Sequence, residues 1–492
     1  MNINKIRSRR QFIKGSAGIA AVPFLPHIVN ASESSGNNHP GNNDSPEVTR
    51  ILAEYVVNAK FEEIPPAAIN EAVRSVFNIV GCSIGGSLHP GMISALSAIG
   101  KLASGGQTSV LGRKEKFPLQ EAALLNGISS HVLDFDDTHL ETIIHPAGPV
   151  ASALFPLSEY IGISGKDFLL AFILGVEVEC RIGLSVYPAH YQAGWHITGT
   201  AGVFGAAAAV GKLLGLNTEQ MIWALGIAAT QSSGFKEMFG TMCKSFHPGN
   251  AARSGMLAAF LAKENFTSTT KGIEADRSFA YVMSTDRDFS FITNGLGDTF
   301  EVEKNTYKPF ACGIVIHPVI DGCIQLRSEH QLSGDHISGV EVEVHPLVLE
   351  LTGKQFPKTG LEGKFSVYHS CSVAILYGEA SPDQYTDEVV RKREVISLRD
   401  KVRAKSDKSL KEDQAEVTVR LTDGRILRKR IDHAIGSLER PMTNEQLCSK
   451  FRSLSKGILP AKQIDQLIDV SFDFKNLKQV SELVRLTQPG KL

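Results

Sequence analysis

Four segments of the sequence gather histidines, lysines and aspartates of the kind that bind small anions and move their protons. The first runs from His131 to His145 and holds three histidines and four acidic residues directly after a predicted helix. Burying so many polar groups is costly unless each finds a partner. We therefore predict that this segment forms part of a site. Its candidate residues are Asp134, Asp137, Thr138 and His145.

Two other interpretations of this first segment stay open. Asp137 or Thr138 could cap a helix that begins near Pro146. Aspartate and histidine are also metal ligands, although the segment lacks the ligand spacing of a metalloprotease helix or of a facial triad.

The second segment, Gly194 to Thr200, opens a helix rich in alanine and glycine. His196 falls in its first turn, where the unpaired backbone N–H groups favour an anion. A histidine beside a tryptophan is equally compatible with a hydrogen-bonded core residue. His196 therefore supports an anion site only together with the other segments.

The third segment contains Lys244, His247 and Arg253 around a helix that is predicted to begin at Pro248. Cationic side chains at the positive end of a helix are unfavourable unless an anion binds there. We therefore predict an anionic ligand. In the alternative interpretation, Lys244 extends along the surface into solvent.

The fourth segment places Lys308 in Tyr307–Cys312 and His317 shortly after it, at the expected junction between two domains. Small-molecule sites form preferentially in clefts between domains. The alternative interpretation is a hinge without chemistry.

The elements that must position these residues follow from length and periodicity. A chain of 492 residues exceeds what one hydrophobic core supports, so two domains are expected. Apolar spacing of three and four predicts helices over these ranges: 66–86, 120–133, 151–163, 167–187, 201–215 and 218–231. Alternation at 339–344 and a hairpin at 415–431 predict strands, with a helix at 365–377 between them.

Helical spacing returns near the end of the chain, at 443–485. The order of elements predicts a mainly α protein in which the chain comes back to complete its first domain. We expect an all-helical domain of residues 47–300 and 438–492, with an α+β domain of residues 301–437 inserted in it.

The N-terminus resembles a twin-arginine export signal, because Arg9 and Arg10 are followed by Phe12, an aliphatic residue and Lys14. Residues 1–31 are expected to be the signal, with cleavage after Ala31, and residues 32–46 a flexible linker. The apolar run is too short for a stable membrane span. The pattern predicts a periplasmic protein that the twin-arginine export machinery carries across the membrane.

Charge and cysteine content exclude other classes. The net charge is −1, and the first 31 residues carry five basic and no acidic groups, which leaves 46 basic against 52 acidic residues in the remainder. A mildly acidic chain without a basic stripe is a poor nucleic-acid binder. The seven cysteines are scattered without a CxxC pair, which fits neither a disulfide framework nor a zinc site.

The four segments, in this order, resemble the MmgE/PrpD family. The resemblance rests on these blocks: DFDDTH, the following HP, GWHITGT, KSFHPGNAAR, YKPFACG with a distal histidine, and Lys364-Phe365-Ser366-Val367. It spans residues 47 to 480. The family includes 2-methylcitrate dehydratase, cis-aconitate decarboxylase and iminodisuccinate epimerase. The resemblance implies a helical domain with an inserted α+β lid, a homodimer and no cofactor or metal.

Carried over residue by residue, the resemblance implies five catalytic residues: Asp134, His145, His196, Lys244 and Lys308. It also leads us to expect substrate contacts from these residues: Asp137, Thr138, His247, Arg253 and His317. The spacing between Thr138 and His145 is one residue longer than in decarboxylase-like members. The position at which those members carry a tyrosine falls near Leu351 here.

The expected reaction moves a proton next to a carboxylate of a di- or tricarboxylic acid. Lys244 and Lys308 would stabilise the developing negative charge, and His145 would act as acid and base. His196 would be its counterpart or a substrate ligand. Dehydration of the 2-methylcitrate type is the first expectation, and decarboxylation or epimerisation are alternatives. A periplasmic organic-acid-binding protein and a metal-dependent hydrolase are the competing classes.

Overall fold

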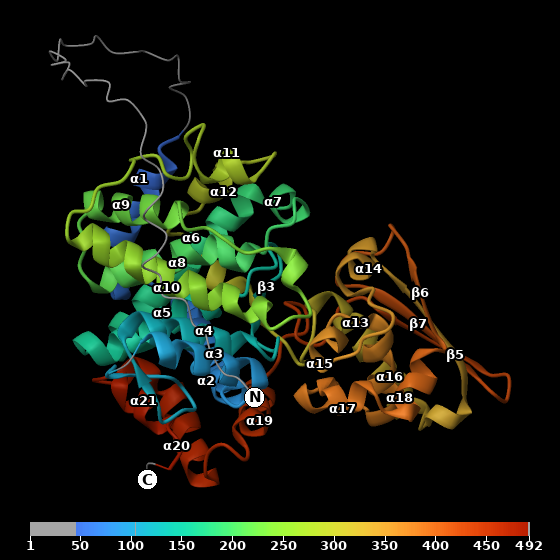
Figure 1. Cartoon of the computed structure of the whole chain (residues 1–492). Helices are drawn as coiled ribbons and strands as arrows, with labels where there is room; N and C mark the ends of the chain where they lie inside the picture. The colour runs from blue at the N-terminus through green and yellow to red at the C-terminus, as the bar shows by residue number, and fades with distance from the viewer. Residues whose placement is uncertain (1–45, 104, 491–492) are drawn as a thin grey trace, which may run out of the picture. The chain divides into compact units, whose positions relative to one another are not determined.

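The computed structural model describes residues 46–103 and 105–490. The predicted signal peptide and all but the last residue of the predicted linker lie outside the described residues. Most of the described chain is α-helical, as expected, and its few strands form three small sheets (Figure 1).

Five helices form the centre of the helical part. They are α4 (Leu119–His131), α5 (Ala147–Ile161), α6 (Gly165–Val186), α8 (Ile197–Leu213) and α10 (Cys243–Lys263). Helix α8 packs between α6 and α10, and α4 packs on α5 and α10. Small residues allow the closest approach: a Cβ atom added to Gly127 of α4 would lie 2.3 Å from the Cα atom of Gly249 in α10. This contact holds the ends of α4 and α10 together.

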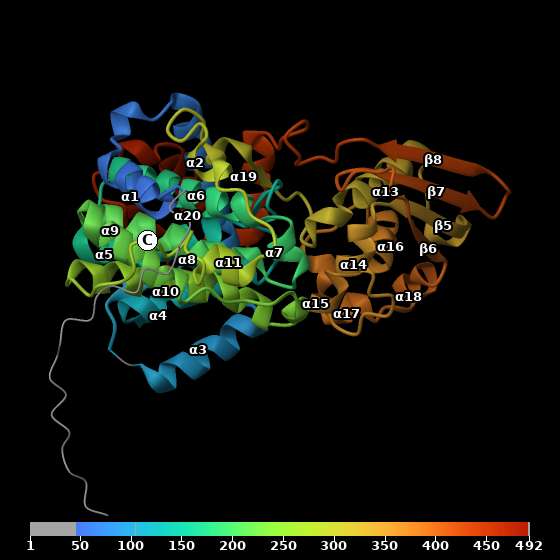
Figure 2. The ribbon, with the colours of Figure 1, turned by 90° about the horizontal axis from the view of Figure 1, so that it is seen from above.

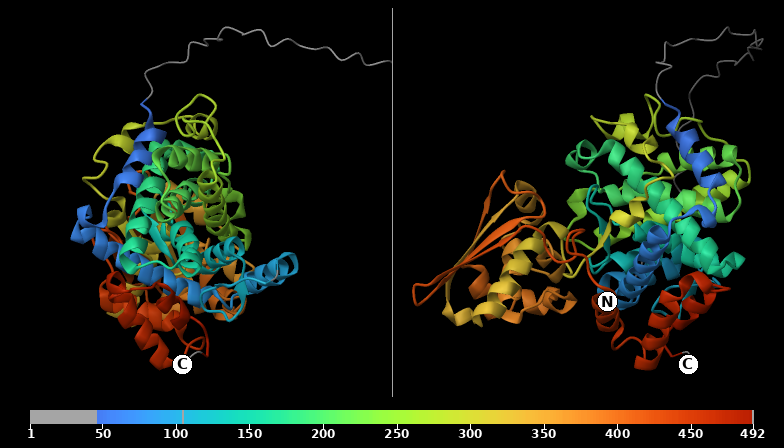
Figure 3. Two further views of the ribbon diagram at one scale, coloured as in Figure 1. Left: turned by 90° about the vertical axis from the view of Figure 1, so that its left-hand side faces the viewer. Right: turned by 180° about the vertical axis from the view of Figure 1, so that it is seen from behind.

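Shorter or peripheral helices surround this centre. They are α1 (Val48–Asn58), α2 (Pro66–Gly86), α3 (Pro90–Leu102), α7 (Ala189–Gln192), α9 (Thr218–Ala229), α11 (Phe279–Met283) and α12 (Ser290–Thr293). The C-terminal helices are α19 (Asn444–Ser455), α20 (Ala461–Phe472) and α21 (Ser481–Leu486). They return to the N-terminal ones (Figure 3), where the ring of Phe451 stacks on that of Phe77 at 4.6 Å between centroids.

A four-stranded sheet lies in the second half of the chain. Its strands are β5 (Ile337–Val344), β6 (Val402–Ser406), β7 (Ala415–Leu421) and β8 (Ile426–Ile431), in the order β6-β5-β7-β8. Only the β5–β6 pair is parallel among these strands. Alternate residues of β5 and β7 are buried where α13 (His317–His330) and α16 (Val367–Tyr377) pack on one face (Figure 2). Because every second side chain of a strand faces the same side of the sheet, this burial explains the alternating pattern in the sequence.

Small helices and strands complete the described chain. The helices are α14 (Pro346–Thr352), α15 (Gly360–Gly363), α17 (Asp387–Val390) and α18 (Arg393–Arg399). The short strands are β1 (Thr108–Ser109), β2 (Lys116–Phe117), β3 (Asp137–His139) and β4 (Asn305–Tyr307).

The prediction that a helix begins at Pro248 is wrong. Helix α10 begins at Cys243 and carries Pro248 inside it. A proline at this position removes only the hydrogen bond that its N–H would donate to the carbonyl of Lys244, so the first turn forms ahead of it. Lys244 and His247 therefore lie in the helix rather than before it.

Among the described residues no single helix combines the length and the apolar character needed to cross a membrane, and only the pair α2 and α3, bent by 81°, passes that test together, by length and composition.

Candidate active site

The loop that follows α4 takes its shape from two backbone features. Asp134 has φ 49°, in the left-handed region, which aspartate tolerates better than most residues. Three residues later the chain enters β3, which pairs antiparallel with β4, so that Asp137 lies opposite Tyr307. The strand pair brings the aspartate loop next to Lys308, the residue that follows β4.

Two lysines meet at Asp134. Its Oδ1 atom accepts hydrogen bonds from Nζ of Lys308 at 2.5 Å and from Nζ of Lys244 at 3.1 Å. All three side chains are buried. Burial alone would raise the pKa of Asp134, but the two ammonium groups outweigh it and hold that pKa well below its usual range. Two ammonium groups therefore face this one carboxylate, and the carboxylate of Asp136, which is also ionised, acts on both of them from further away.

Behind Lys244 lies a second hydrogen-bond chain, from His131 to Asp136. Lys244 Nζ lies 2.9 Å from Nε2 of His131, and Nδ1 of His131 lies 2.7 Å from Oδ2 of Asp136. An ammonium group can only donate, so Nε2 accepts and Nδ1 donates its proton to the carboxylate. His131 and Asp136 were not among the predicted site residues, although both belong to the first segment.

His145 is held as a base. Its Nδ1 lies 2.6 Å from the backbone carbonyl of Asp137, which can only accept, so the ring proton is on Nδ1 and the lone pair on Nε2. The Thr138 hydroxyl lies 3.2 Å from the same Nδ1 atom. Burial, followed by the charge of Lys308, holds the pKa of His145 well below its usual value. The imidazole is therefore neutral in the unliganded protein at neutral pH.

His196 stands at the start of α8 and contacts a fourth histidine. Its Nδ1 lies 2.7 Å from Nδ1 of His247, so one of the two rings donates to the other. Burial and then the charge of Lys244 lower the pKa of His196 well below its usual value. The rings of His145 and His196 have centroids 6.3 Å apart.

These groups line one narrow cavity, which we call the lysine pocket. Its volume is about 30 Å³, about the share of one water molecule in the liquid. The lining residues are Asp134, Ile143, His145, Tyr191, His196, Phe239, Lys244, Lys308, Gly313, Ile314, Val315, Leu351, Thr352 and Phe365. The structure thus brings together all five residues that were predicted to be catalytic. Leu351, near the position at which decarboxylase-like members carry a tyrosine, also lies on this wall.

Asp137 and Thr138 do not line the lysine pocket. Oδ2 of Asp137 accepts from Ser75, from Asn305 and, at 3.1 Å, from the backbone N–H of Ala147. The last contact is a cap on the first residue of α5, the alternative interpretation made from the sequence. Burial and then the neighbouring charge of Asp136 raise the pKa of Asp137 to about 7. Thr138 reaches the pocket only through His145, so this geometry supports no direct substrate contact by either residue.

The other three predicted substrate contacts also lie off this wall. His247 lies behind His196. Arg253 donates to Asn250 at 2.9 Å on the same helix, α10, because its position in the helix turns it away from the pocket. His317 lines a neighbouring cavity instead.

Two buried lysines that were not among the predicted site residues fix the pocket from behind, although Lys364 belongs to one of the sequence blocks that carry the resemblance. Lys450 of α19 donates to the carbonyls of Phe135 and Lys308, at 2.6 and 2.9 Å. Lys364 donates to the carbonyls of Leu133 and Ala311, both at 2.6 Å. Each ammonium group therefore ties the aspartate loop to the segment around Lys308. Their sequence signal was weak, because lysine is most often a surface residue.

The donor set favours an anion over a metal cation. Ligand atoms of His131, His145 and His196 lie within 4.8 Å of one another, which by number would suit a zinc ion. The lone pair of His131 is taken by Lys244, and two ammonium groups would repel a cation at this point.

Comparison with known proteins finds two family models that match this chain. The MmgE/PrpD N-terminal domain matches residues 50–292, and the MmgE/PrpD C-terminal domain matches residues 310–473. The chain is 26% identical to the cis-aconitate decarboxylase-like protein oryM of Aspergillus oryzae, over 89% of this chain and 97% of that protein. It is 26% identical to a cis-aconitate decarboxylase of Aspergillus terreus, over 89% and 95%. It is 22% identical to the 2-methylcitrate dehydratase of Escherichia coli, over 89% and 97%.

Proposed function

The chain belongs to the MmgE/PrpD family, and we propose that it is a lyase that moves a proton beside a carboxylate of a small di- or tricarboxylic acid. One observation carries this proposal. Two buried ammonium groups share a single carboxylate at a cavity that two neutral histidines also line. Such a cavity attracts an anion and holds groups that can take up its proton.

The lysine pair supplies binding and stabilisation. Each ammonium group has three N–H donors and uses two of them within the protein, so a substrate carboxylate that approaches Lys244 and Lys308 can accept a hydrogen bond from each. When a proton is removed from the adjacent carbon, negative charge spreads onto that carboxylate. Fixed cations stabilise this charge more than the ground state, and they do so strongly because the site is shielded from water.

The histidine pair supplies proton transfer. Nε2 of His145 carries the lone pair and takes the proton from carbon. Elimination of water also requires a proton on the departing hydroxyl group, and His145, which becomes protonated when it takes the proton from carbon, can give that proton to it. His196 stands across the pocket and can hold the hydroxyl group by a hydrogen bond. A base that can return its proton to a leaving group favours dehydration of a hydroxy acid, of the kind catalysed by 2-methylcitrate dehydratases.

Decarboxylation is the second candidate, favoured by the comparisons. The chain is 26% identical to the Aspergillus terreus decarboxylase but 22% identical to the Escherichia coli dehydratase. A departing carboxylate is also helped by apolar surroundings, which Phe239, Leu351 and Phe365 provide on the pocket wall.

One incubation series tests the proposal. The purified protein is mixed separately with 2-methylcitrate, citrate, cis-aconitate and iminodisuccinate, and alkene absorbance, carbon dioxide and optical rotation are followed. Alkene formation from a hydroxy acid supports dehydration, and carbon dioxide release supports decarboxylation. Tight binding with no turnover of any acid would instead identify a binding protein. Activity that disappears with a chelator and returns with a metal would contradict the expected independence of cofactors.

We also propose that the protein is exported to the periplasm through the twin-arginine machinery and acts as a homodimer. The paired arginines at positions 9 and 10 support export, and the family resemblance supports the dimer. Replacing both with lysine should leave the protein in the cytoplasm of the host, which cell fractionation measures. Sedimentation equilibrium tests the dimer.

A further inference from the structure

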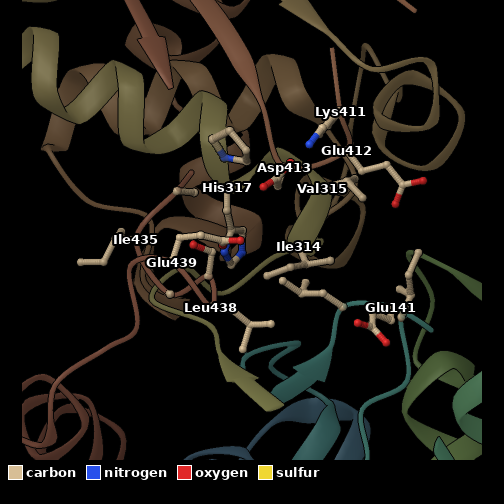
Figure 4. A pocket seen from close by; sticks show the side chains of 16 residues that line it. Glu141, Ile314, Val315, His317, Lys411, Glu412, Asp413, Ile435, Leu438 and Glu439 are labelled. Atoms are coloured by element: carbon tan, nitrogen blue, oxygen red, sulfur yellow. The ribbon is translucent and has the colours of Figure 1, made fainter. Parts of the chain in front are cut away.

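A second cavity adjoins the lysine pocket. Its volume is about 390 Å³, within the range of pockets that hold small molecules. Three aliphatic residues, Ile143, Ile314 and Val315, line both cavities. Figure 4 shows Ile314 and Val315 beside His317 on the wall of the second cavity. The side chains that the two cavities share are therefore aliphatic.

A buried histidine without a partner marks this cavity as a site for a ligand. His317, the first residue of α13, lines the second cavity and is 2% exposed. Among the described residues, neither of its ring nitrogens has a hydrogen-bond partner of good geometry, although the backbone of Cys312 lies close enough to raise its pKa. Burial and then the nearby charge of Lys308 lower its pKa to about 3, so the ring is neutral. Buried polar groups are normally satisfied, so an unpaired imidazole at a cavity wall points to a ligand group that completes it.

Size indicates that a substrate extends into the second cavity. The lysine pocket, at about 30 Å³, is too small for a tricarboxylate with three charged groups to place. The second cavity is more than ten times larger and shares three lining side chains with it. A molecule whose acidic head lies at Lys244 and Lys308 would enter the second cavity by displacing these shared side chains.

The charges on the wall of the second cavity indicate which part of a substrate can bind in it. Four acidic side chains line the second cavity, Glu141, Glu412, Asp413 and Glu439, against one lysine, Lys411. Lys304 pairs with Glu141, and His433 pairs with Asp413 and Glu439, so the acidic groups still outnumber the basic ones. A distal carboxylate would be repelled there. The remaining wall is largely aliphatic, with Pro318 and Leu438 among its residues. These surroundings suit an uncharged hydrocarbon chain.

We propose that the substrate is a di- or tricarboxylic acid that carries an aliphatic substituent longer than a methyl group, whose acidic head binds in the lysine pocket and whose uncharged tail fills the second cavity. The unpaired nitrogens of His317 then meet a hydroxyl or carboxyl group of the head at the junction. This inference rests on the proposed function for its chemistry, but the binding of the tail can be measured separately.

A homologous series of acids tests it. The values of kcat/KM are compared for citrate and its 2-methyl, 2-propyl and 2-hexyl derivatives. Each methylene buried in the cavity should raise kcat/KM about fourfold, the equivalent of about 0.8 kcal/mol per buried CH₂ group. A hexyl chain that ends in a carboxylate should lose this gain. Values that do not rise with chain length would overturn the inference.

Two variants locate the tail. Leu438→Trp and Ile435→Trp place a bulky indole ring in the second cavity, and neither residue lines the lysine pocket. Each should lower kcat/KM at least tenfold for the hexyl acid and leave the value for citrate unchanged. Ile426→Trp is the matched control, because Ile426 is exposed on β8 and does not line this cavity. Equal losses on both acids, or loss in the control alone, would contradict the assignment.

Calorimetric binding to the His145→Ala protein separates this inference from the proposed function. Affinity that rises with chain length, together with no turnover by the unaltered protein, would keep the second cavity as the tail site and reject the lyase. Turnover with affinity independent of chain length would keep the lyase and reject the tail site.

Discussion

Lys244 and Lys308 donate to the same oxygen atom, Oδ1 of Asp134, from α10 and from the segment after β4. The two ammonium groups are thereby held within one buried cluster, although like charges repel. Oδ2 of Asp134 has no hydrogen-bond partner in residues 46–103 and 105–490. The carboxylate therefore acts as the shared counterion of both lysines.

Asp134→Asn removes the negative charge that the two lysines share and keeps the size and shape of the side chain. Asparagine also accepts the left-handed conformation of this position, so the backbone should stay in place. The lysines lose their shared counterion, and we expect kcat/KM for the preferred acid to fall about 100-fold or more. Steady-state kinetics measures this, with circular dichroism as the check on folding. If kcat/KM falls by less than about threefold in a folded variant, Asp134 is not needed as the counterion of the two lysines.

His145→Ala should abolish turnover while the protein still binds its acid. Loss of a general base costs about 10² to 10⁴ in rate. Binding should persist because Lys244 and Lys308 remain. The matched control is His330→Ala, which removes a histidine at the far end of α13 that is exposed. Full activity of His145→Ala would assign the base to another residue.

As the pH is lowered, kcat/KM should begin to fall only below pH 6.5. The pKa of His145 is lowered by burial and by Lys308, so the base stays unprotonated at pH values where an ordinary histidine is charged. As pH falls, activity is therefore retained through 6.5 and lost only when pH reaches the lowered pKa. The dependence of kcat/KM on pH reports this value for the free enzyme. An acid limb above pH 6.5 would be incompatible with a base in this environment.

Lys450→Met should destabilise the pocket from outside it. The change leaves the carbonyls of Phe135 and Lys308 without a donor, at about 1–3 kcal/mol for each. We expect the free energy of unfolding to fall by about 2–6 kcal/mol, as measured by urea titration. Lys456→Met, on the exposed residue after the same helix, should change it by less than about 0.5 kcal/mol. Equal effects of the two changes would show that the buried bonds contribute nothing.

Asp137→Asn should change how stability depends on pH. The folded-state pKa of about 7 exceeds the unfolded value near 3.8, so the unfolded chain releases its proton first as pH rises. The stability that the protonated Asp137 contributes is complete below about pH 4 and declines until about pH 7. The wild-type advantage over the variant should shrink across that window. Unfolding titrations at several pH values measure it, and a constant difference would mean that Asp137 does not titrate there.

Local periodicity was sufficient to predict most of the elements. The range predicted for α2 agrees with the structure at both ends, and the hairpin of β7 and β8 turns where predicted. Both follow from side-chain spacing and turn chemistry, which act between near neighbours. The start of α10 was missed because Pro248 was read as a helix start, whereas packing against α4 and α8 extends the helix by one more turn.

The amino-acid sequence alone determined the family, the mainly α class and the five residues that meet at the lysine pocket. Only the tertiary structure decided the direction of each side chain in the loop between α4 and α5. There Asp134 and His145 face the pocket and Asp137 caps α5 behind it, while His131, the last residue of α4, accepts a hydrogen bond from Lys244. In a helix or strand, spacing fixes which residues share a face. In this loop, the left-handed φ of Asp134 and partners distant in sequence fix the directions instead, and neither can be read from spacing.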